Sequence, residues 1–163
     1  LFNDDNCVGV KTGFTDNAGR CLVNATEKDN MRVVSVVLNC QPMFEECARL
    51  DRLAYDNYTY KQFVKPYNYV GTTYIESGDK EEVGVASIEG FGMLIKRGEE
   101  DLFRVKYDVP ETATAPVVLN QKLGSVTVYK GDDIVYNSNL YAIDSINNID
   151  FRYMMDNIIS KWF

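Results

Sequence analysis

Hydrophobic and polar positions alternate along the first forty residues in the manner of β-strands. The pattern predicts strands over Val8–Phe14, Cys21–Thr26 and Met31–Asn39, of which the third is rich in β-branched residues. The polar residues Glu27–Asn30 form a turn signal between the second strand and the third. Three successive strands with short connections predict an antiparallel meander.

The hydrophobic period then changes from two residues to that of a helix. Met43, Cys47, Leu50 and Ala54 recur at helical spacing, which predicts a helix over about Pro42–Tyr58. A proline and two acidic residues at the start of this segment suit the first turn of a helix. The apolar stripe of the helix needs a sheet to cover, and we expect it to pack on the meander.

Short strand-like runs separated by Gly/Asp turns follow the helix. They are Tyr69–Ile75, Glu82–Ile88, Phe91–Lys96, Leu102–Asp108, Gly124–Lys130 and Ile134–Ala142. This regular spacing predicts a small antiparallel β-sandwich. We therefore expect a mixed, mainly β chain with three parts: residues 1–62, a sandwich over residues 63–148, and a terminal segment over residues 149–163.

The terminal segment has the pattern of an amphipathic helix. Its apolar positions are Phe151, Met154, Met155, Ile158, Ile159, Trp162 and Phe163. Such a helix can pack on a protein core or lie in a membrane interface, and a terminal Trp-Phe pair suits the interface. The polar face carries no excess of basic residues, so these residues alone leave both alternatives open.

Composition limits the classes of function. The 163 residues are 45% hydrophobic and 12% aromatic, as in a globular protein with a real core. Seventeen basic and 24 acidic residues give a net charge of −7, which argues against nucleic acid as a partner. No run of 18 apolar residues is long enough to cross a membrane as a helix.

The side chains that hold most metals and activate most nucleophiles are scarce. Histidine is absent, which excludes Ser-His-Asp and Cys-His mechanisms supplied from within this chain. Cys7, Cys21, Cys40 and Cys47 lack C-x-x-C spacing, which argues against a metal site and a thioredoxin-like site. No organic cofactor is expected either. The cysteines can be free, mostly buried thiols or disulfides, and the sequence leaves this open.

Lys11-Thr12-Gly13 carries the clearest chemistry in the chain. A strand in an acyl-transfer site needs a cation, a hydroxyl for the substrate carboxylate, and a glycine where the substrate backbone lies close. A backbone N–H just beyond, here that of Phe14, can face the developing oxyanion. Taken alone, these three residues favour the alternative of an exposed strand end whose side chains face solvent.

The wider sequence resembles a known family. K-T-G-x-T-x-x-A-G is present without a gap from Lys11 to Gly19, and the two strands and helix after it match the end of the transpeptidase-like domain in serine D-alanyl-D-alanine carboxypeptidases, the low-molecular-mass penicillin-binding proteins. Residues 115–135 resemble the carboxy-terminal β-sandwich of these enzymes. The terminal segment resembles the amphipathic helix that attaches them to the outer face of the bacterial cytoplasmic membrane.

The resemblance implies roles for the motif. Lys11 and Thr12 would hold the substrate carboxylate, Gly13 and Thr15 would complete the substrate-binding strand, and the N–H of Phe14 would help form the oxyanion hole. The substrate would be a peptidoglycan stem peptide ending in D-Ala-D-Ala, trimmed through an acyl-enzyme. β-Lactams would acylate the same serine.

The chain departs from the family pattern in two ways. The family often has an arginine before the F-E-E opening of the last helix; here Met43 stands there, so a role for that arginine is not carried over. The family's nucleophile, in Ser-x-x-Lys, and its Ser-x-Asn both precede KTG. Here S-G-D-K at Ser77–Lys80 and S-I-N at Ser145–Asn147 follow it, and we interpret both as chance matches.

We therefore expect the end of a catalytic domain, a sandwich and a terminal helix, in a chain that begins without methionine and lacks the nucleophile. The isolated chain should be inactive. Its partial domain should leave an apolar face for the missing amino-terminal part or for a second copy. A non-catalytic wall- or membrane-surface binding module is the alternative, whereas a β-lactamase-like hydrolase fits the motif but not the appended sandwich.

Overall fold

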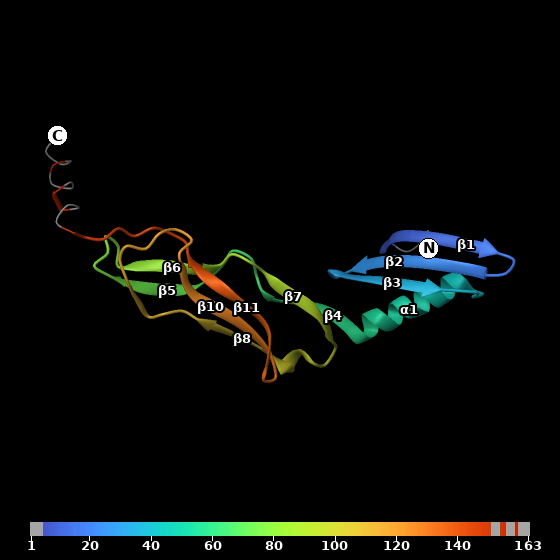
Figure 1. The fold of residues 1–163 in the computed structure, drawn as a ribbon. Coiled ribbons are helices and arrows are strands. Elements are labelled where there is room, and N and C mark those ends of the chain that lie inside the picture. Colours follow the sequence, from blue (N-terminus) through green and yellow to red (C-terminus); the bar gives the residue numbers. More distant parts are fainter. Residues whose placement is uncertain (1–4, 151–153, 156–158, 160–163) are drawn as a thin grey trace. The chain divides into compact units, whose positions relative to one another are not determined.

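The structure, a computed structural model, describes residues 5–150, 154, 155 and 159. The chain divides into two compact units, and each is described by itself. The first unit contains Leu1–Lys61 and Met93–Glu100, and the second contains Gln62–Gly92 and Asp101–Phe163. Strands dominate both units (Figure 1), which confirms the expected mixed, mainly β class.

The first unit is an antiparallel three-stranded sheet with a helix on one face. The strands are β1 (Cys7–Thr15), β2 (Gly19–Lys28) and β3 (Met31–Val37), in the order β1-β2-β3. Helix α1 (Met43–Asn57) follows directly. Pro42 stands just before the first helical residue, where its fixed φ and missing N–H do no harm.

Alternation along β2 and β3 decides which face α1 covers. The side chains that form the apolar core under the helix are Leu22, Val37, Met43 and Cys47, with Cys40 and Leu50 packed against them. The side chains of α1 that face the sheet, Met43, Cys47 and Leu50, recur at helical spacing along the sequence. The apolar stripe of α1 therefore packs on the meander as expected.

Part of this helix–sheet interface is polar. The Asn24 side-chain amide donates to a carboxylate oxygen of Asp51 across 2.6 Å, and both residues are buried. The Tyr55 hydroxyl donates to Oγ1 of buried Thr26 across 2.9 Å. These hydrogen bonds join α1 to β2 and satisfy polar atoms that burial would otherwise leave without water.

The carboxy-terminal end of α1 is bound by a distant residue. The backbone N–H of Arg97 donates to the Asn57 carbonyl at 2.8 Å, and its Nε donates to the Tyr55 carbonyl at 3.0 Å. A helix leaves its last carbonyls without partners, so these bonds explain why residues 93–100 belong to the first unit.

The second unit is built on a six-stranded sheet in the order β8-β10-β11-β6-β5-β9. Its strands are β5 (Asn68–Glu76), β6 (Glu82–Ser87), β8 (Phe103–Asp108), β9 (Thr112–Thr114), β10 (Lys122–Lys130) and β11 (Asp133–Ala142). A short 3-10 helix, η1 (Glu100–Leu102), precedes β8. The core is mostly aliphatic: Val64, Ile75, Val83, Val85, Val117, Val126, Val128, Leu140 and Ile146 are almost fully buried.

Two strands differ from expectation. β4 (Tyr58–Val64) forms a two-stranded sheet with β7 (Phe91–Lys96), although no strand was predicted between the helix and Tyr69. β9 lies between the predicted strands Leu102–Asp108 and Gly124–Lys130, where no strand was expected. It pairs in parallel with β5, so the second unit is not wholly antiparallel. A three-residue strand is too short for alternation to identify it.

The expected terminal helix lies largely outside the described residues, among them Phe151, Ile158, Trp162 and Phe163. Met154, Met155 and Ile159 have helical backbone and are exposed. Within the part of the chain that the structure describes, no helix is long and apolar enough to cross a membrane.

Candidate functional site

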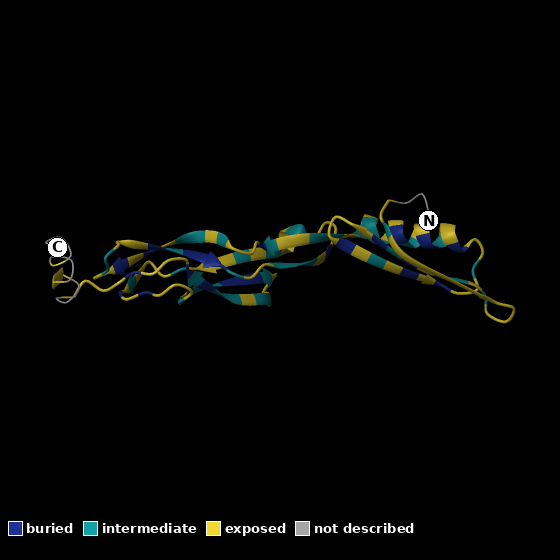
Figure 2. Cartoon of the chain, turned by 90° about the horizontal axis from the view of Figure 1, so that it is seen from above, coloured by how far each residue is buried: buried dark blue, intermediate teal, exposed yellow. Residues whose placement is uncertain are grey.

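The KTG motif lies on β1, which is exposed along almost its whole length (Figure 2). Register with β2 separates its side chains into two sets, because directly opposed residues of an antiparallel pair point to the same face. Lys11 and Gly13 oppose Val23 and Cys21. The side chains of Lys11, Val23 and Cys21 therefore lie on the face away from α1, and Gly13 leaves that face of β1 open.

Thr12 and Phe14 lie on the other face of the hairpin. They oppose Leu22 and Arg20. Leu22 is buried against α1, so this is the face that the helix covers further along β2. Thr12 is exposed, and 66% of the surface of Phe14 is open to solvent. The motif thus presents its cation and its hydroxyl on opposite faces of one strand.

Local contacts fix the turn that follows the motif. The N–H of Ala18 donates to Oγ1 of Thr15 across 3.0 Å, so this hydroxyl closes the hairpin. Gly19 has φ +65, a conformation that glycine adopts without strain. A Cβ on Gly19 would lie 2.1 Å from Oδ1 of Asn39, so only glycine lets the β3–α1 connection approach this closely.

The ammonium of Lys11 hydrogen-bonds the carbonyl of Thr12. This contact turns the side chain along β1 rather than towards an acidic partner. Among the described residues, Lys11 makes no ion pair. The charge of Lys11 is therefore available to a group that approaches the exposed face of the strand.

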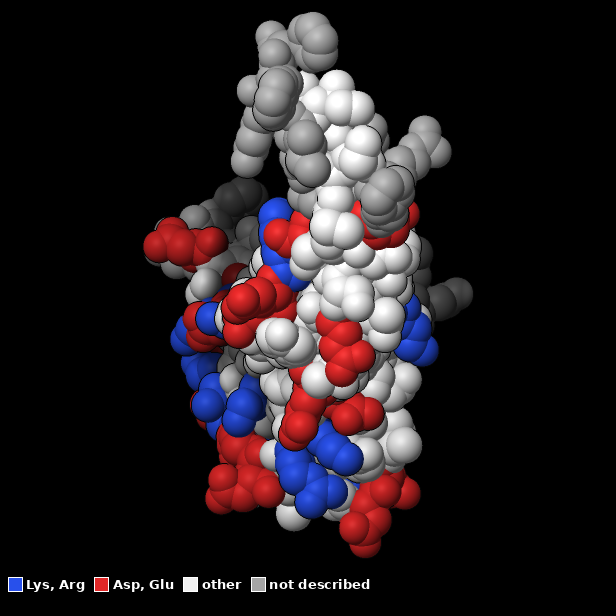
Figure 3. Space-filling view, turned by 90° about the vertical axis from the view of Figure 1, so that its left-hand side faces the viewer, with Lys and Arg blue, Asp and Glu red and all other residues white. Residues whose placement is uncertain are grey.

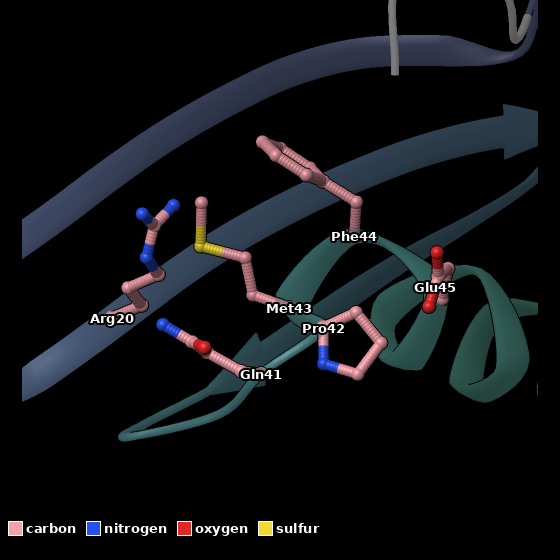
Figure 4. A pocket seen from close by; sticks show the side chains of 6 residues that line it. All are labelled: Arg20, Gln41, Pro42, Met43, Phe44 and Glu45. Atoms are coloured by element: carbon pink, nitrogen blue, oxygen red, sulfur yellow. The ribbon is translucent and has the colours of Figure 1, made fainter.

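A pocket of about 440 Å³ opens beside the end of this hairpin, where β2 begins and α1 starts. It is lined by Arg20, Gln41, Pro42, Met43, Phe44 and Glu45 (Figure 4). The Arg20 carbonyl accepts the Cys40 N–H at 2.9 Å, which brings the approach to α1 against β2. No motif marks Arg20 as a site residue in the sequence; it only follows Gly19, the last residue of the family pattern.

The two out-of-order motifs form structural contacts in the second unit. Lys80 pairs with Asp144, which raises the pKa of the Lys80 ammonium and lowers the pKa of the Asp144 carboxyl. Asn147 donates twice to Asp79, at 2.9 Å and 2.8 Å, and these bonds lower the pKa of the Asp79 carboxyl. A lysine held charged in this way is a poor base for a serine, consistent with chance matches.

Within the described residues, no three histidine, cysteine or acidic side chains come together in a way that could hold a metal ion. The four cysteines are free thiols, and only Cys47 is buried. Burial raises the pKa of the Cys47 thiol, because a thiolate is poorly solvated between β2, β3 and α1.

Comparison with known families identifies both parts of the chain. Residues 58–148 match the penicillin-binding protein 5 C-terminal domain, and residues 1–42 match the D-alanyl-D-alanine carboxypeptidase family. The chain belongs to the penicillin-binding protein 5 family of D-alanyl-D-alanine carboxypeptidases. The resemblance carried by the KTG strand and the later strands is thereby confirmed.

Curated relatives include two D-alanyl-D-alanine carboxypeptidases. D-alanyl-D-alanine carboxypeptidase DacD of Escherichia coli K12 is 29% identical over 145 residues, covering 86% of this chain and 37% of the relative. DacF of Bacillus subtilis 168 is 25% identical over 159 residues, covering 94% of this chain and 41% of the relative. The chain spans about two-fifths of the length of these relatives.

Solved structures share the fold. The DacD carboxypeptidase from Francisella tularensis is 25% identical with a TM-score of 0.53, and the match covers 90% of this chain and 38% of that chain. Penicillin-binding protein 5 from Haemophilus influenzae superposes with a TM-score of 0.58 at 21% identity, covering 86% of this chain and 43% of that chain.

Proposed function

We propose that this chain is the carboxy-terminal part of a serine-type D-alanyl-D-alanine carboxypeptidase that trims peptidoglycan stem peptides. The observation that carries the proposal is the exposed KTG strand, Lys11–Thr15, within a segment that matches the carboxypeptidase family. Residues 1–62 would complete the catalytic domain, and residues 63–148 would form the appended β-domain. The protein would act on the outer face of the bacterial cytoplasmic membrane.

The chemistry divides between this chain and the segment that would precede it. A serine activated by its lysine would attack the carbonyl of the terminal D-Ala-D-Ala bond and release D-alanine, and water would then hydrolyse the acyl-enzyme. Lys11 and Thr12 would bind the substrate through charge and hydrogen bonding. The N–H of Phe14 would stabilise the oxyanion, and Gly13 would let the substrate backbone lie against β1. β-Lactams would acylate the same serine.

The proposal is tested with a fluorescent penicillin. We expect the 163-residue chain alone to remain unlabelled on a denaturing gel, because it lacks the nucleophile. The longer protein that includes the preceding segment should be labelled, and it should release D-alanine from a peptide ending in D-Ala-D-Ala. A labelled band of this chain's size would contradict the first part, and no D-alanine release by the longer protein would contradict the carboxypeptidase function.

We propose that another polypeptide covers the sheet face of the first unit that α1 leaves open. Val23, Val34 and Val36 form this valine face, with 43%, 61% and 53% of their surfaces exposed. Val23 opposes Val36 across β2 and β3, so these side chains are neighbours on one face. The missing amino-terminal part of the catalytic domain or a second copy of the chain would cover it.

A non-catalytic wall- or membrane-surface binding module is the second candidate. In the second unit, Tyr67, Leu119 and Ile143 are exposed around an uncharged pocket of about 420 Å³. Figure 3 shows a surface band without charged side chains beside interspersed acidic and basic ones. The exposed residues Met154, Met155 and Ile159 would belong to the proposed membrane-attached helix.

Liposome co-sedimentation separates membrane attachment from a purely structural role of this region. The chain and a variant ending at Asp150 are compared at equal concentration. Loss of sedimentation in the shortened variant would support an anchor formed by residues 151–163. Equal sedimentation of the two would refute that anchor.

A further inference from the structure

Arg20 is a cation beside the KTG strand whose side chain has no partner among the described residues. Two other arginines of this unit form ion pairs: Arg32 pairs with Glu27, and Arg49 pairs with Glu46, each at 2.6 Å. Arg20 is exposed, so its guanidinium keeps all its donors available. Such a group is suited to bind a carboxylate through two parallel hydrogen bonds.

The strand register places Arg20 next to Thr12. Thr12 opposes Leu22, and Phe14 opposes Arg20, so Thr12 and Arg20 are diagonal neighbours on the same face of the hairpin. Diagonal neighbours in an antiparallel pair have backbones roughly 7–8 Å apart. A carboxylate can bridge a hydroxyl and a guanidinium over that separation, whereas Lys11 lies on the opposite face.

The pocket around Arg20 favours an anion at one end. Arg20 supplies the positive charge of its lining, while Met43 and Phe44 supply apolar walls. Glu45, the acidic residue of the lining, lies on the other side of Phe44 from Arg20, and Met43 lies beside Arg20 (Figure 4). Gln41 adds an uncharged polar side chain to the lining.

We infer that Arg20 binds the C-terminal carboxylate of the peptide substrate, together with Thr12. This inference rests on the proposed carboxypeptidase function and assigns a specificity residue to the same site. Met43 at the start of α1 brings no charge to this pocket, so Arg20 on β2 supplies the positive charge of its lining. Lys11, on the other face of β1, is left to stabilise charge at the reacting bond.

The test compares a peptide ending in D-Ala-D-Ala with the same peptide bearing a C-terminal amide. In the longer, active protein, Arg20→Gln should lower kcat/KM for the free acid about 10- to 100-fold, the range for a lost hydrogen bond to a charged group. The amide should be a poor substrate of both proteins, and its kcat/KM should not change. Arg32→Gln on β3 is the matched control and should leave both substrates unaffected.

Keeping the charge at the same position gives the sharper result. Arg20→Lys retains a positive charge on β2 without the planar guanidinium, and we expect it to recover part of the activity that R20Q loses on the free acid. Unchanged folding of both variants should be verified by their thermal midpoints. Equal losses by R20Q on acid and amide, or no difference between R20Q and R20K on the free acid, would overturn the inference.

Binding to the 163-residue chain gives a readout that does not depend on the nucleophile. Titration with N-acetyl-D-Ala-D-Ala should shift the Nε–Hε NMR resonance of Arg20, and the C-terminal amide should not. If the wild-type enzyme and R20Q release D-alanine at the same rate, the role of Arg20 is rejected and the proposed function stands. A wild-type enzyme that releases none would reject the proposed function itself.

Discussion

At the scale of single residues, Gly19 carries the tightest constraint near the site. Its φ of +65 lies in the left-handed region, and a Cβ would lie 2.1 Å from Oδ1 of Asn39. Gly19→Ala should therefore lower the free energy of unfolding by about 1–3 kcal/mol, measured by urea denaturation. Gly9→Ala is the control, because its Cβ would meet that of Ala25 at 3.8 Å, an ordinary contact. Equal losses in the two variants would contradict this account.

The thiols should differ in reactivity. The pKa of the Cys47 thiol is raised from its ordinary value of 9.0 by burial, whereas Cys40 is only partly buried. In the folded chain at pH 8, iodoacetamide should therefore modify Cys47 at least about tenfold more slowly than it modifies Cys40. Mass spectrometry of the digested protein gives both rates, and denaturant should remove the difference.

The raised pKa of the Cys47 thiol also predicts how the free energy of unfolding depends on pH. A raised folded-state pKa means that the unfolded chain loses this proton first as pH rises. The stabilising contribution is therefore present below pH 9.0 and is lost as pH rises through the folded-state pKa. Cys47→Ala should show a smaller loss of stability between pH 8 and pH 10 than the parent chain. An identical loss in both would contradict the assignment.

At the scale of elements, the hydrogen bond between Asn24 and Asp51 joins β2 to α1. Asn24→Ala would leave a buried carboxylate without its donor, so the free energy of unfolding should fall by about 1–3 kcal/mol. Asn17→Ala, in the exposed β1–β2 turn, is the control and should change stability little. If the two variants unfold at the same urea concentration, the bond contributes nothing measurable to helix docking.

Element prediction from sequence succeeded where the hydrophobic period persists over many residues. The meander and α1 have such periods, so their existence and order were predictable. β9 has three residues and forms by pairing with β5, which is distant in the chain. β4 follows directly on α1 and pairs with β7, so only long-range hydrogen bonding reveals it as a strand.

At the scale of the whole molecule, the valine face should drive association of the isolated chain. Light scattering should detect species larger than a monomer, because three exposed valines lie together on one sheet face. V34K/V36K should shift the chain towards the monomer. Ile134→Lys in the second unit, where Ile134 is 63% exposed, is the control and should not do so. A monodisperse wild-type monomer would contradict the prediction.

The candidate site was predictable only in part. Lys11, Thr12 and Gly13 form a contiguous motif, so the sequence alone identifies them as a candidate substrate strand. Arg20 belongs to no motif, and its proximity to Thr12 follows from cross-strand register. Met43 is conspicuous in sequence as a departure from the family pattern. Its position beside Arg20 follows from the way the start of α1 packs against β2.

The alternation of strands and helix, the KTG motif and the lack of histidine can be read from the chain residue by residue. Only the fold shows that Lys11 and Thr12 face opposite ways, that Arg20 and Thr12 are diagonal neighbours, and that the valines lie open on the face that α1 leaves uncovered. These features follow from register and packing, which depend on hydrogen bonds and contacts between residues far apart in the chain.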